Sequence, residues 1–242
     1  MDTPISSRAD FVYKSLRSQI TKLEIPPGRA LPEAHLASQF EISKTPIREA
    51  LARLRYDGFV VVDNNSRFHA APVTIKDTQD LFAMRTLLES EAAALAASRP
   101  IEDGDLKVLE SLQTTSYDVN DSDSIDAFLE ANTRFHVLVG YASGNLRLAK
   151  VLEVTMNQME RLFRVGLTLS SRTEEIVHEH VELVRAIKEG DADRARIEAT
   201  RQVRSSRGMV IDALLAREEI YAMPLKIPAR RSKLETFRAS AG

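Results

Sequence analysis

The stretch at residues 43–54, SKTPIREALARL, decides the fold of the first third of this 242-residue chain. Ser43 suits a helix N-cap, because a serine hydroxyl can accept hydrogen bonds from the free amides of a first turn. Pro46 falls within that turn, where a missing N–H costs little. Apolar side chains then follow at the spacing i, i+3, i+4, i+7, which predicts a helix with a buried stripe of Ile47, Ala50, Leu51 and Leu54.

The neighbouring face of this predicted helix is polar and basic, with Lys44, Thr45, Arg48 and Arg55. Lysine and arginine donate to phosphate or guanine, and a threonine hydroxyl is small enough to lie close to base edges. The face therefore favours a helix that reads DNA. An ordinary amphipathic helix with a solvated basic face is the alternative for this stretch alone.

The residues before this helix predict two more helices. An apolar face indicates a helix over residues 9–23, and the proline pair in residues 25–28 must end it. A short helix restarts within residues 31–40, and only two residues separate it from Ser43. Two short helices joined by a tight turn, the second basic at its start, form the helix-turn-helix layout.

A β-hairpin is predicted after the third helix, which Gly58 ends. Residues 59–62 read as a strand, residues 63–66 as a hairpin turn and residues 67–71 as a return strand. Three helices followed by a hairpin make a winged helix, which we assign to a domain over residues 1–74.

The run I-x-x-L-E-I-P-P-G-x-x-L-P-E-x-x-L-A-x-x-F-x-I-S-K-T-P-I-R-E-A-L-x-x-L-x-x-D-G-F-V, from Ile20, resembles the N-terminal domain of the GntR family of bacterial transcription regulators. The sequence departs from the family pattern at two places. Lys44 stands where the family often has arginine, and lysine lacks the two-point hydrogen-bonding fork of a guanidinium. The family usually has a glycine near the position of Arg67 at the wing tip, and this chain has none there. The resemblance and the wing position together predict a set of DNA-binding residues: Ser43, Lys44, Thr45, Arg48, Arg55, Asn65 and Arg67.

Charge is unevenly distributed along the chain. Residues 1–74 have a net charge of +2, residues 75–221 of −8 and residues 222–242 of +4, which sum to −2. A basic N-terminal domain followed by an acidic C-terminal domain suits a protein in which only the N-terminal domain contacts nucleic acid.

The chain has no cysteine, which excludes a disulfide framework, a thiolate zinc site and a cysteine nucleophile. No apolar run has membrane-spanning length, and residues 1–10 lack the apolar core of a signal peptide, so we expect a cytoplasmic protein without a membrane partner.

The body, residues 75–221, is predicted to be an all-α bundle. Helical periodicity and capping signals recur and no strand pattern appears. The expected helices cover residues 74–98, 103–117, 124–141, 145–169, 173–189 and 191–216, with Ser124 capping the third and Asp191 the last. Residues 222–242 hold two prolines and many charges, which predicts a basic, disordered tail.

Several polar side chains interrupt the apolar faces of the bundle. Arg85 and Glu89 are four residues apart on one helix, as a surface ion pair would be. Asn132 and His136 share a face for the same reason. On the fifth helix, His180 is in register with the apolar residues of the buried face and His178 is not, which predicts that only His180 points inward. A hydrogen-bonded structural role is the ordinary alternative for such a histidine.

These positions also resemble the FCD domain, the ligand-binding body of the FadR-like branch of the family. The matching motifs are RTLLE from Arg85, N-x-x-F-H from Asn132, GN at Gly144, and E-H-x-x-L-x-x-A-I-x-x-G-D from Glu179. The resemblance implies a ligand pocket formed by Arg85, Asn132, His136, Asn145, His180 and Gln202.

Many members of this branch bind a divalent metal at such a site. Here Asn132 stands at the common aspartate position and Gln202 at that of a third histidine. His136 and His180, with Asn132, leave a poor ligand set for zinc or nickel. Two outcomes therefore remain open: a bound metal, or a metal-free polar pocket that holds a small molecule by hydrogen bonds.

Three functions are compatible with this reading. We predict a regulator, not an enzyme, that binds a pseudo-palindromic double-stranded operator as a homodimer and acts as a repressor released by a small organic acid. A constitutive DNA-binding protein with a non-functional pocket is the alternative that the missing third histidine suggests. A metal-dependent enzyme built on the bundle would explain the histidines but not the winged-helix head.

Overall fold

The computed structural model describes residues 7–167 and 173–216, which fall into two units that divide between Pro72 and Val73. The first unit has three helices and a hairpin, and the regular elements of the second are all helices among its described residues. The predicted mostly α fold, a winged helix-turn-helix followed by a helical bundle, is confirmed. The tail expected at residues 222–242 lies outside the described residues.

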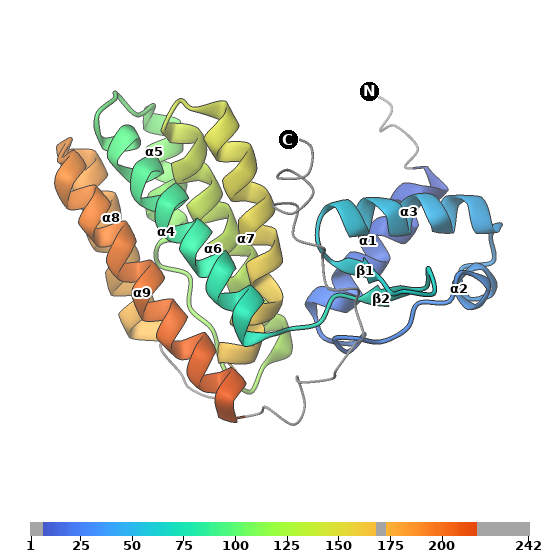
Figure 1. Cartoon of the computed structure of the whole chain (residues 1–242). Helices are drawn as coiled ribbons and strands as arrows, with labels where there is room; N and C mark the ends of the chain where they lie inside the picture. The colour runs from blue at the N-terminus through green and yellow to red at the C-terminus, as the bar shows by residue number, and fades with distance from the viewer. Residues whose placement is uncertain (1–6, 168–172, 217–242) are drawn as a thin grey trace, which may run out of the picture. The chain divides into compact units, whose positions relative to one another are not determined.

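The N-terminal unit packs two helices against a third (Figure 1). Its elements in chain order are α1 (Arg8–Thr21), α2 (Glu33–Gln39), α3 (Lys44–Tyr56), β1 (Val60–Val62) and β2 (Phe68–Ala70). Helix α3 contacts α1, α2 and β1, so its apolar stripe lies at the centre of the unit. The stripe predicted from the spacing is fully buried, since each of its residues is 0% exposed: Ile47, Ala50, Leu51 and Leu54.

The hairpin of this unit pairs β1 with β2 in antiparallel register, with Val61 opposite His69. Its turn requires a residue with positive φ, and Ser66 occupies that conformation at φ 60°. A serine therefore adopts the left-handed conformation that ordinarily favours glycine. The return strand is shorter than predicted, because only Phe68–Ala70 pair with β1.

Two helix boundaries in this unit differ from the expectation. Ser43 does occupy the N-cap position of α3, but its side chain makes no capping hydrogen bond, so the predicted hydroxyl cap is wrong. The hydroxyl is exposed instead. Helix α1 ends at Thr21, before the predicted residue 23, because Leu23 adopts a left-handed conformation with φ 62°.

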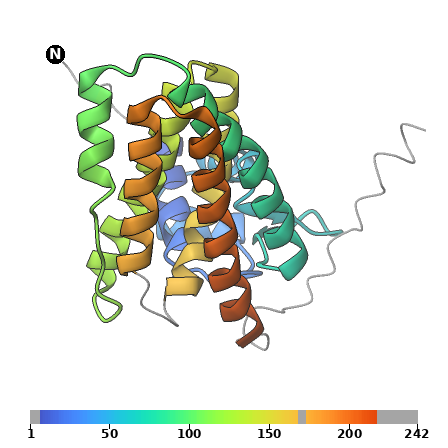
Figure 2. The same ribbon diagram turned by 90° about the vertical axis from the view of Figure 1, so that its left-hand side faces the viewer.

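The C-terminal unit is a bundle in which α4 is the central helix (Figures 1 and 2). Helix α4 contacts α6, α7, α8 and α9, whereas the short α5 packs on α6 and α8. None of the described helices is long and apolar enough to cross a membrane. The helix bounds are α4 (Ile75–Ala97), α5 (Asp103–Leu112), α6 (Ser122–Ala142), α7 (Leu146–Leu167), α8 (Thr173–Glu189) and α9 (Ala192–Ala216).

Local side-chain hydrogen bonds explain where the bundle helices depart from the predicted bounds. Helix α5 ends at Leu112 and not at residue 117, because Thr114 bonds back to the carbonyl of Ser111 and competes with the helix. Helix α6 begins two residues before the predicted cap. Asp121 caps it, and the hydroxyl of Ser124 accepts instead from the backbone N–H of Asp118 at 2.9 Å.

Candidate functional site

The exposed face of α3 presents the basic residues that the spacing predicted. Lys44, Thr45, Arg48 and Arg55 are all exposed, on the face of the helix that neighbours its buried stripe. No described residue of the first turn of α3 is acidic. This face therefore offers flexible cations and a hydroxyl at the positive end of a helix, where an anion is favoured.

Arg48 is held by an acidic residue of the preceding helix. Its Nε donates to Oε1 of Glu33 at 3.0 Å and its Nη2 donates to Oε2 at 2.8 Å. Hydrogen bonding to Arg48 lowers the pKa of the Glu33 carboxyl and raises that of Arg48. Glu33 thus accepts the same pair of hydrogen bonds from Arg48 that a guanine base or a phosphate would accept.

The turn of the hairpin is organised by Asp63. Its carboxylate accepts from the backbone N–H groups of Asn65 and Arg67, each at 2.9 Å, and from Nε of Arg67 at 2.9 Å. His69 Nε2 lies 3.1 Å from the same carboxylate. The backbone bond from Arg67 is the largest of the effects that hold the pKa of Asp63 far below its usual range. Asn65 and Arg67 are exposed on the wing, and Arg67 leans back onto Asp63.

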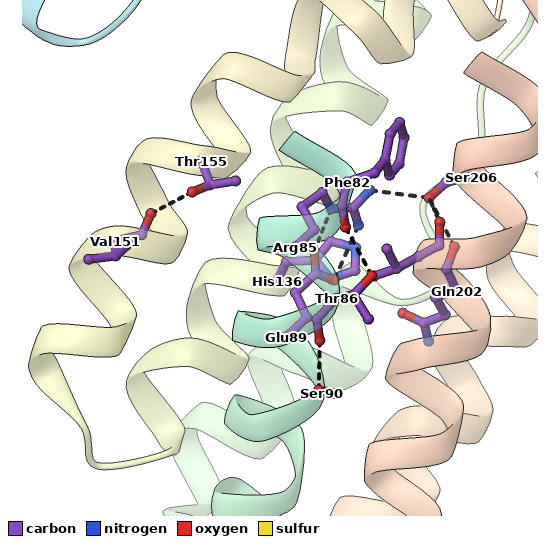
Figure 3. Close-up of polar contacts among 11 residues, drawn as sticks. Phe82, Arg85, Thr86, Glu89, Ser90, His136, Val151, Thr155, Gln202 and Ser206 are labelled. Carbon is purple, nitrogen blue, oxygen red and sulfur yellow. Dashed lines mark hydrogen bonds and ion pairs between the residues drawn. The ribbon is translucent and has the colours of Figure 1, made fainter. Parts of the chain in front are cut away.

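A second candidate site lies inside the bundle, around a buried ion pair on α4 (Figure 3). Arg85 is 1% and Glu89 3% exposed, so the alternative of a surface ion pair is wrong. Arg85 Nε donates to Glu89 Oε1, and Arg85 Nη2 donates to Glu89 Oε2 at 3.2 Å. His136 on α6 places Nδ1 3.0 Å from that Oε2. One carboxylate therefore joins α4 to α6.

The charges of this cluster balance locally. Burial by itself raises the pKa of the Glu89 carboxyl, but the charges of Arg85 and then His136 outweigh burial and lower it. The Arg85 guanidinium also lies over two aromatic rings, 5.0 Å from the centroid of Phe163 and 5.4 Å from that of Phe82. These contacts stabilise a cation that would be costly to bury alone.

Helix α9 completes the cluster with two polar residues one turn apart. Arg85 Nη1 donates to the hydroxyl of Ser206 at 3.1 Å, and that hydroxyl lies 2.9 Å from the carbonyl of Gln202. The side chain of Gln202 donates from Nε2 to the backbone carbonyl of Glu179 on α8 at 2.6 Å. The site therefore joins α4, α6, α8 and α9.

His180 points inward from α8, and His178 is exposed, as the register predicted. The ring of His180 stacks on Phe135 at 4.2 Å and meets the ring of His136 edge to face at 5.3 Å. Burial, and then the charge of His136, lower the pKa of His180 well below 6.5. His180 is therefore a neutral imidazole at pH 7, with one nitrogen that donates and one that accepts.

A cavity opens between these side chains. Its volume is about 30 Å³, which is room for about two waters. Five of the six predicted ligand-binding residues line it: Arg85, Asn132, His136, His180 and Gln202. Its other walls come from Phe128, Phe163, Leu167, Ile176, Glu179, Ser206 and Met209.

Asn145 is the predicted ligand residue that the structure does not bring to this cavity. It precedes α7, is exposed, and its side-chain oxygen accepts from the backbone N–H of Leu148 at 3.2 Å. Its carboxamide therefore serves as a helix cap. The sequence interpretation also missed Ser206, although its position four residues after Gln202 places both on one face of a helix.

The donors at this site do not fit the divalent metal that the family resemblance implies. Among residues 7–167 and 173–216, no three His, Cys, Asp or Glu side chains are grouped so that they could hold a metal ion. Nδ1 of His136 is engaged by Glu89, and Gln202 turns its amide nitrogen to a carbonyl. Two imidazoles and two amides are a weak set for zinc or nickel.

Both units match sequence families. The model of the bacterial regulatory proteins of the gntR family matches residues 8–69, and that of the FCD domain matches residues 80–204. These bounds coincide with the winged helix and with most of the bundle.

Individual relatives match most of the length of the chain. The chain is 28% identical over 198 residues to the uncharacterized HTH-type transcriptional regulator YdhC of Bacillus subtilis, covering 81% of this chain and 87% of that protein. It is 29% identical over 153 residues to the Nta operon transcriptional regulator of Aminobacter aminovorans, covering 63% and 70%. The solved structure of Escherichia coli McbR/YncC shares the fold, with a TM-score of 0.67, 22% identity and coverage of 86% and 99%.

Proposed function

The chain belongs to the GntR family of bacterial transcription regulators and carries an FCD domain, and from this premise we propose that it is a cytoplasmic repressor released by a small organic acid. It is a regulator and not an enzyme, because its family and its named relatives are transcription regulators. The observation that carries the ligand response is a buried arginine on the wall of a cavity in the bundle.

Operator binding is assigned to the exposed face of α3. Lys44, Thr45 and Arg48 lie near the helix N-terminus, where side chains of a recognition helix reach base edges. Ser43 and Arg55 extend the same face, and Asn65 and Arg67 offer wing contacts to a minor groove. The predicted repression rests on the family resemblance, because many members of the family leave the operator when a metabolite binds.

A homodimer follows from the size of this surface. One recognition helix per chain covers too little DNA for specific affinity, whereas two helices on half-sites about one helical turn apart suffice. The operator is then a pseudo-palindrome. Ligand binding changes the relative placement of the two heads only if the ligand has different affinities for the two arrangements.

The effector is proposed to be a carboxylate held by Arg85. A guanidinium has five N–H groups, and three of those on Arg85 bond to Glu89 and Ser206, which leaves two without a partner among the described residues. A carboxylate can accept from these two, and its charge offsets the cost of desolvating a cation in a buried site. His136, His180 and Asn132 then surround the rest of the molecule.

A constitutive DNA-binding protein is the second candidate, and one observation favours it. Arg85, Glu89 and His136 satisfy one another by hydrogen bonds, as a closed structural cluster would. A thermal-shift screen of the full chain against short carboxylates separates the two candidates, because a ligand of the folded state raises the melting temperature and a non-functional pocket gives no shift.

The decisive experiment removes the arginine while the fold is kept. Removal of one partner of a buried ion pair costs about 3–5 kcal/mol, whereas replacement of both by apolar residues is often nearly neutral. We therefore expect the double variant Arg85→Met with Glu89→Leu to fold, to bind operator, and to ignore carboxylates that release the wild-type protein. Arg134→Met, at an exposed position of α6, is the control. Release of the double variant at the wild-type carboxylate concentration would refute the assignment.

A further inference from the structure

The imidazole of His69, on β2 of the winged-helix unit, is buried between two oxygen atoms. Its side chain is 9% exposed. Nδ1 lies 3.2 Å from the backbone carbonyl of Gly28, and Nε2 lies 3.1 Å from Oδ2 of Asp63. Rotation of the ring by half a turn would bring C–H groups to both oxygens, so hydrogen bonding favours the orientation in which both nitrogens face them.

Neither of these two oxygens can donate a hydrogen bond. A backbone carbonyl only accepts, and so does an ionised carboxylate. Hydrogen bonds, of which the one from the backbone of Arg67 has the largest effect, hold the pKa of Asp63 far below its usual range, so this carboxyl is ionised. A neutral imidazole has one donating and one accepting nitrogen, and it would leave a lone pair against one of the two oxygens. Only the imidazolium of His69 donates to both.

The two oxygens belong to different segments of the wing. Residues 28–31 lie beside β2, where the backbone N–H of Leu31 donates to the carbonyl of Phe68 at 2.8 Å. Asp63 begins the turn of the hairpin, and its Oδ1 accepts from two backbone N–H groups of that turn. His69 therefore joins the turn to the segment on the other side of β2.

The charged groups around His69 come from both of these segments. Oδ2 of Asp63 also accepts from Nη2 of Arg67 at 2.8 Å, and the exposed Arg29 follows Gly28 in the chain. Strand β1, which pairs with β2, consists of three valines and brings no titratable group. Asp63 is thus the anion that His69 and Arg67 share, so the protonation state of His69 affects the side chain that holds Arg67.

We propose that His69 is a positioning residue of the wing, which holds the hairpin turn as an imidazolium and loosens it when the ring loses its proton. Histidine changes charge between about pH 5 and pH 8, so the turn is ordered at the acidic end of this range. The consequence for DNA rests on the proposed function, in which Asn65 and Arg67 contact a minor groove. Because protonation favours the ordered wing, operator affinity decreases as the pH rises.

The first test follows the wing in the absence of DNA. We expect NMR order parameters of the backbone N–H groups of Asn65 and Arg67, measured on the full chain, to decrease between about pH 6 and pH 8. In His69→Gln, which has no proton to lose in this range, they should stay constant. Order parameters that do not change with pH in the wild type would overturn the positioning role.

The second test measures operator affinity, with a duplex that the protein selects from a random-sequence library as the probe. At constant ionic strength, the wild-type affinity should fall by about three- to tenfold between about pH 6 and pH 8, within the tenfold per pH unit that one proton allows. His69→Gln should remove most of this decrease. His35→Gln, at an exposed position of α2, is the matched control and should retain it. An equal decrease in wild type and His69→Gln would overturn the inference.

A variant of Asp63 tests the donor and acceptor argument itself. Asp63→Asn keeps one oxygen for the backbone of the turn and replaces Oδ2 with an amide nitrogen, which can donate to a neutral Nε2 of His69. The neutral ring then satisfies both neighbours, so order parameters and affinity should become independent of pH. A pH dependence as large as that of the wild type would show that His69 does not act through Asp63. This variant and the wild-type order parameters decide the question even if His69→Gln does not fold.

The inference and the proposed function fail differently. Order parameters that follow pH, combined with an operator affinity that does not, contradict the wing contacts of Asn65 and Arg67 and leave the positioning role of His69 standing. Constant order parameters in the wild type overturn that role, whichever residues contact DNA.

Discussion

Glu33 on α2 and Arg48 on α3 form a two-point ion pair across the helix-turn-helix, 2.8 Å at its shorter contact. The side chain of Arg48 is 68% exposed, so the pair is solvent-screened and contributes little to stability. Its consequence is geometric, because Glu33 restricts the direction in which the guanidinium points. If Arg48 contacts the operator as proposed, Glu33 competes with DNA for that guanidinium.

We predict that Glu33→Gln tightens binding to unrelated DNA by a few-fold at low salt and narrows the preference for operator. The variant removes a negative charge near the duplex and frees the Arg48 fork for any phosphate. Glu49→Gln removes the same charge from the exposed surface of α3 and is the control. The ratio of operator to random-sequence affinity, measured by fluorescence anisotropy, should fall for the first variant alone. Equal ratios would show that the pair has no role in recognition.

Arg48→Ala should weaken operator binding by about 1–3 kcal/mol and relax sequence preference if Arg48 contacts guanine. If it contacts only phosphate, affinity should fall on all sequences and the salt slope should decrease by about one. Titrations at several salt concentrations distinguish these two modes. Arg147→Ala, an exposed arginine of the bundle, should leave both quantities unchanged. Unchanged affinity of Arg48→Ala on every DNA would mean that α3 is not the reading helix.

Acidification below about pH 6.5 should destabilise the bundle through His180. Folding lowers the pKa of this histidine, so below 6.5 the unfolded chain binds a proton that the folded chain excludes. Stability is therefore lost as pH falls through this range, by at most about 1.4 kcal/mol per pH unit. Folding lowers the pKa of Glu89 from 4.5, so the stability that its ionised form contributes is lost only below about pH 4.5.

Melting temperatures at pH 7.5 and 5.0 check this prediction. His180→Gln should show a smaller decrease than wild type, because its side chain does not titrate. His178→Gln changes an exposed histidine two residues earlier on α8 and should follow the wild type. If His180→Gln loses as much stability as wild type, another group carries the dependence.

Gln202→His should increase the affinity for Zn²⁺ or Ni²⁺, since it adds a third imidazole to His136 and His180. The wild-type chain, dialysed against EDTA and then buffer, should hold much less than one metal per chain by elemental analysis. Gln113→His places an imidazole outside the cavity and should leave metal binding unchanged. One tightly held metal per wild-type chain would contradict the inference that these side chains are a weak ligand set for a divalent metal.

Apolar spacing was sufficient to predict most helices and their buried faces. The stripe of α3 from Ile47 to Leu54 and the inward position of His180 both follow from the helical period, because a residue's direction about a helix axis depends only on its number. Helix ends were less predictable. Ser124 and Asp121 are both good caps, and which one begins α6 depends on the loop contact between Ser124 and Asp118.

The family resemblance, not the spacing, grouped residues from different helices into one pocket. Spacing placed Arg85 with Glu89 and Asn132 with His136, each on a single helix, but it carries no information on how helices face one another. Tertiary packing alone decided that Glu89 also contacts His136, that Ser206 contacts Arg85, and that Asn145 caps α7 outside the pocket. It also left Oε1 of Gln202 without a donor in the part of the chain that the structure describes, because the position of one carbonyl on α8 determines which way that amide turns.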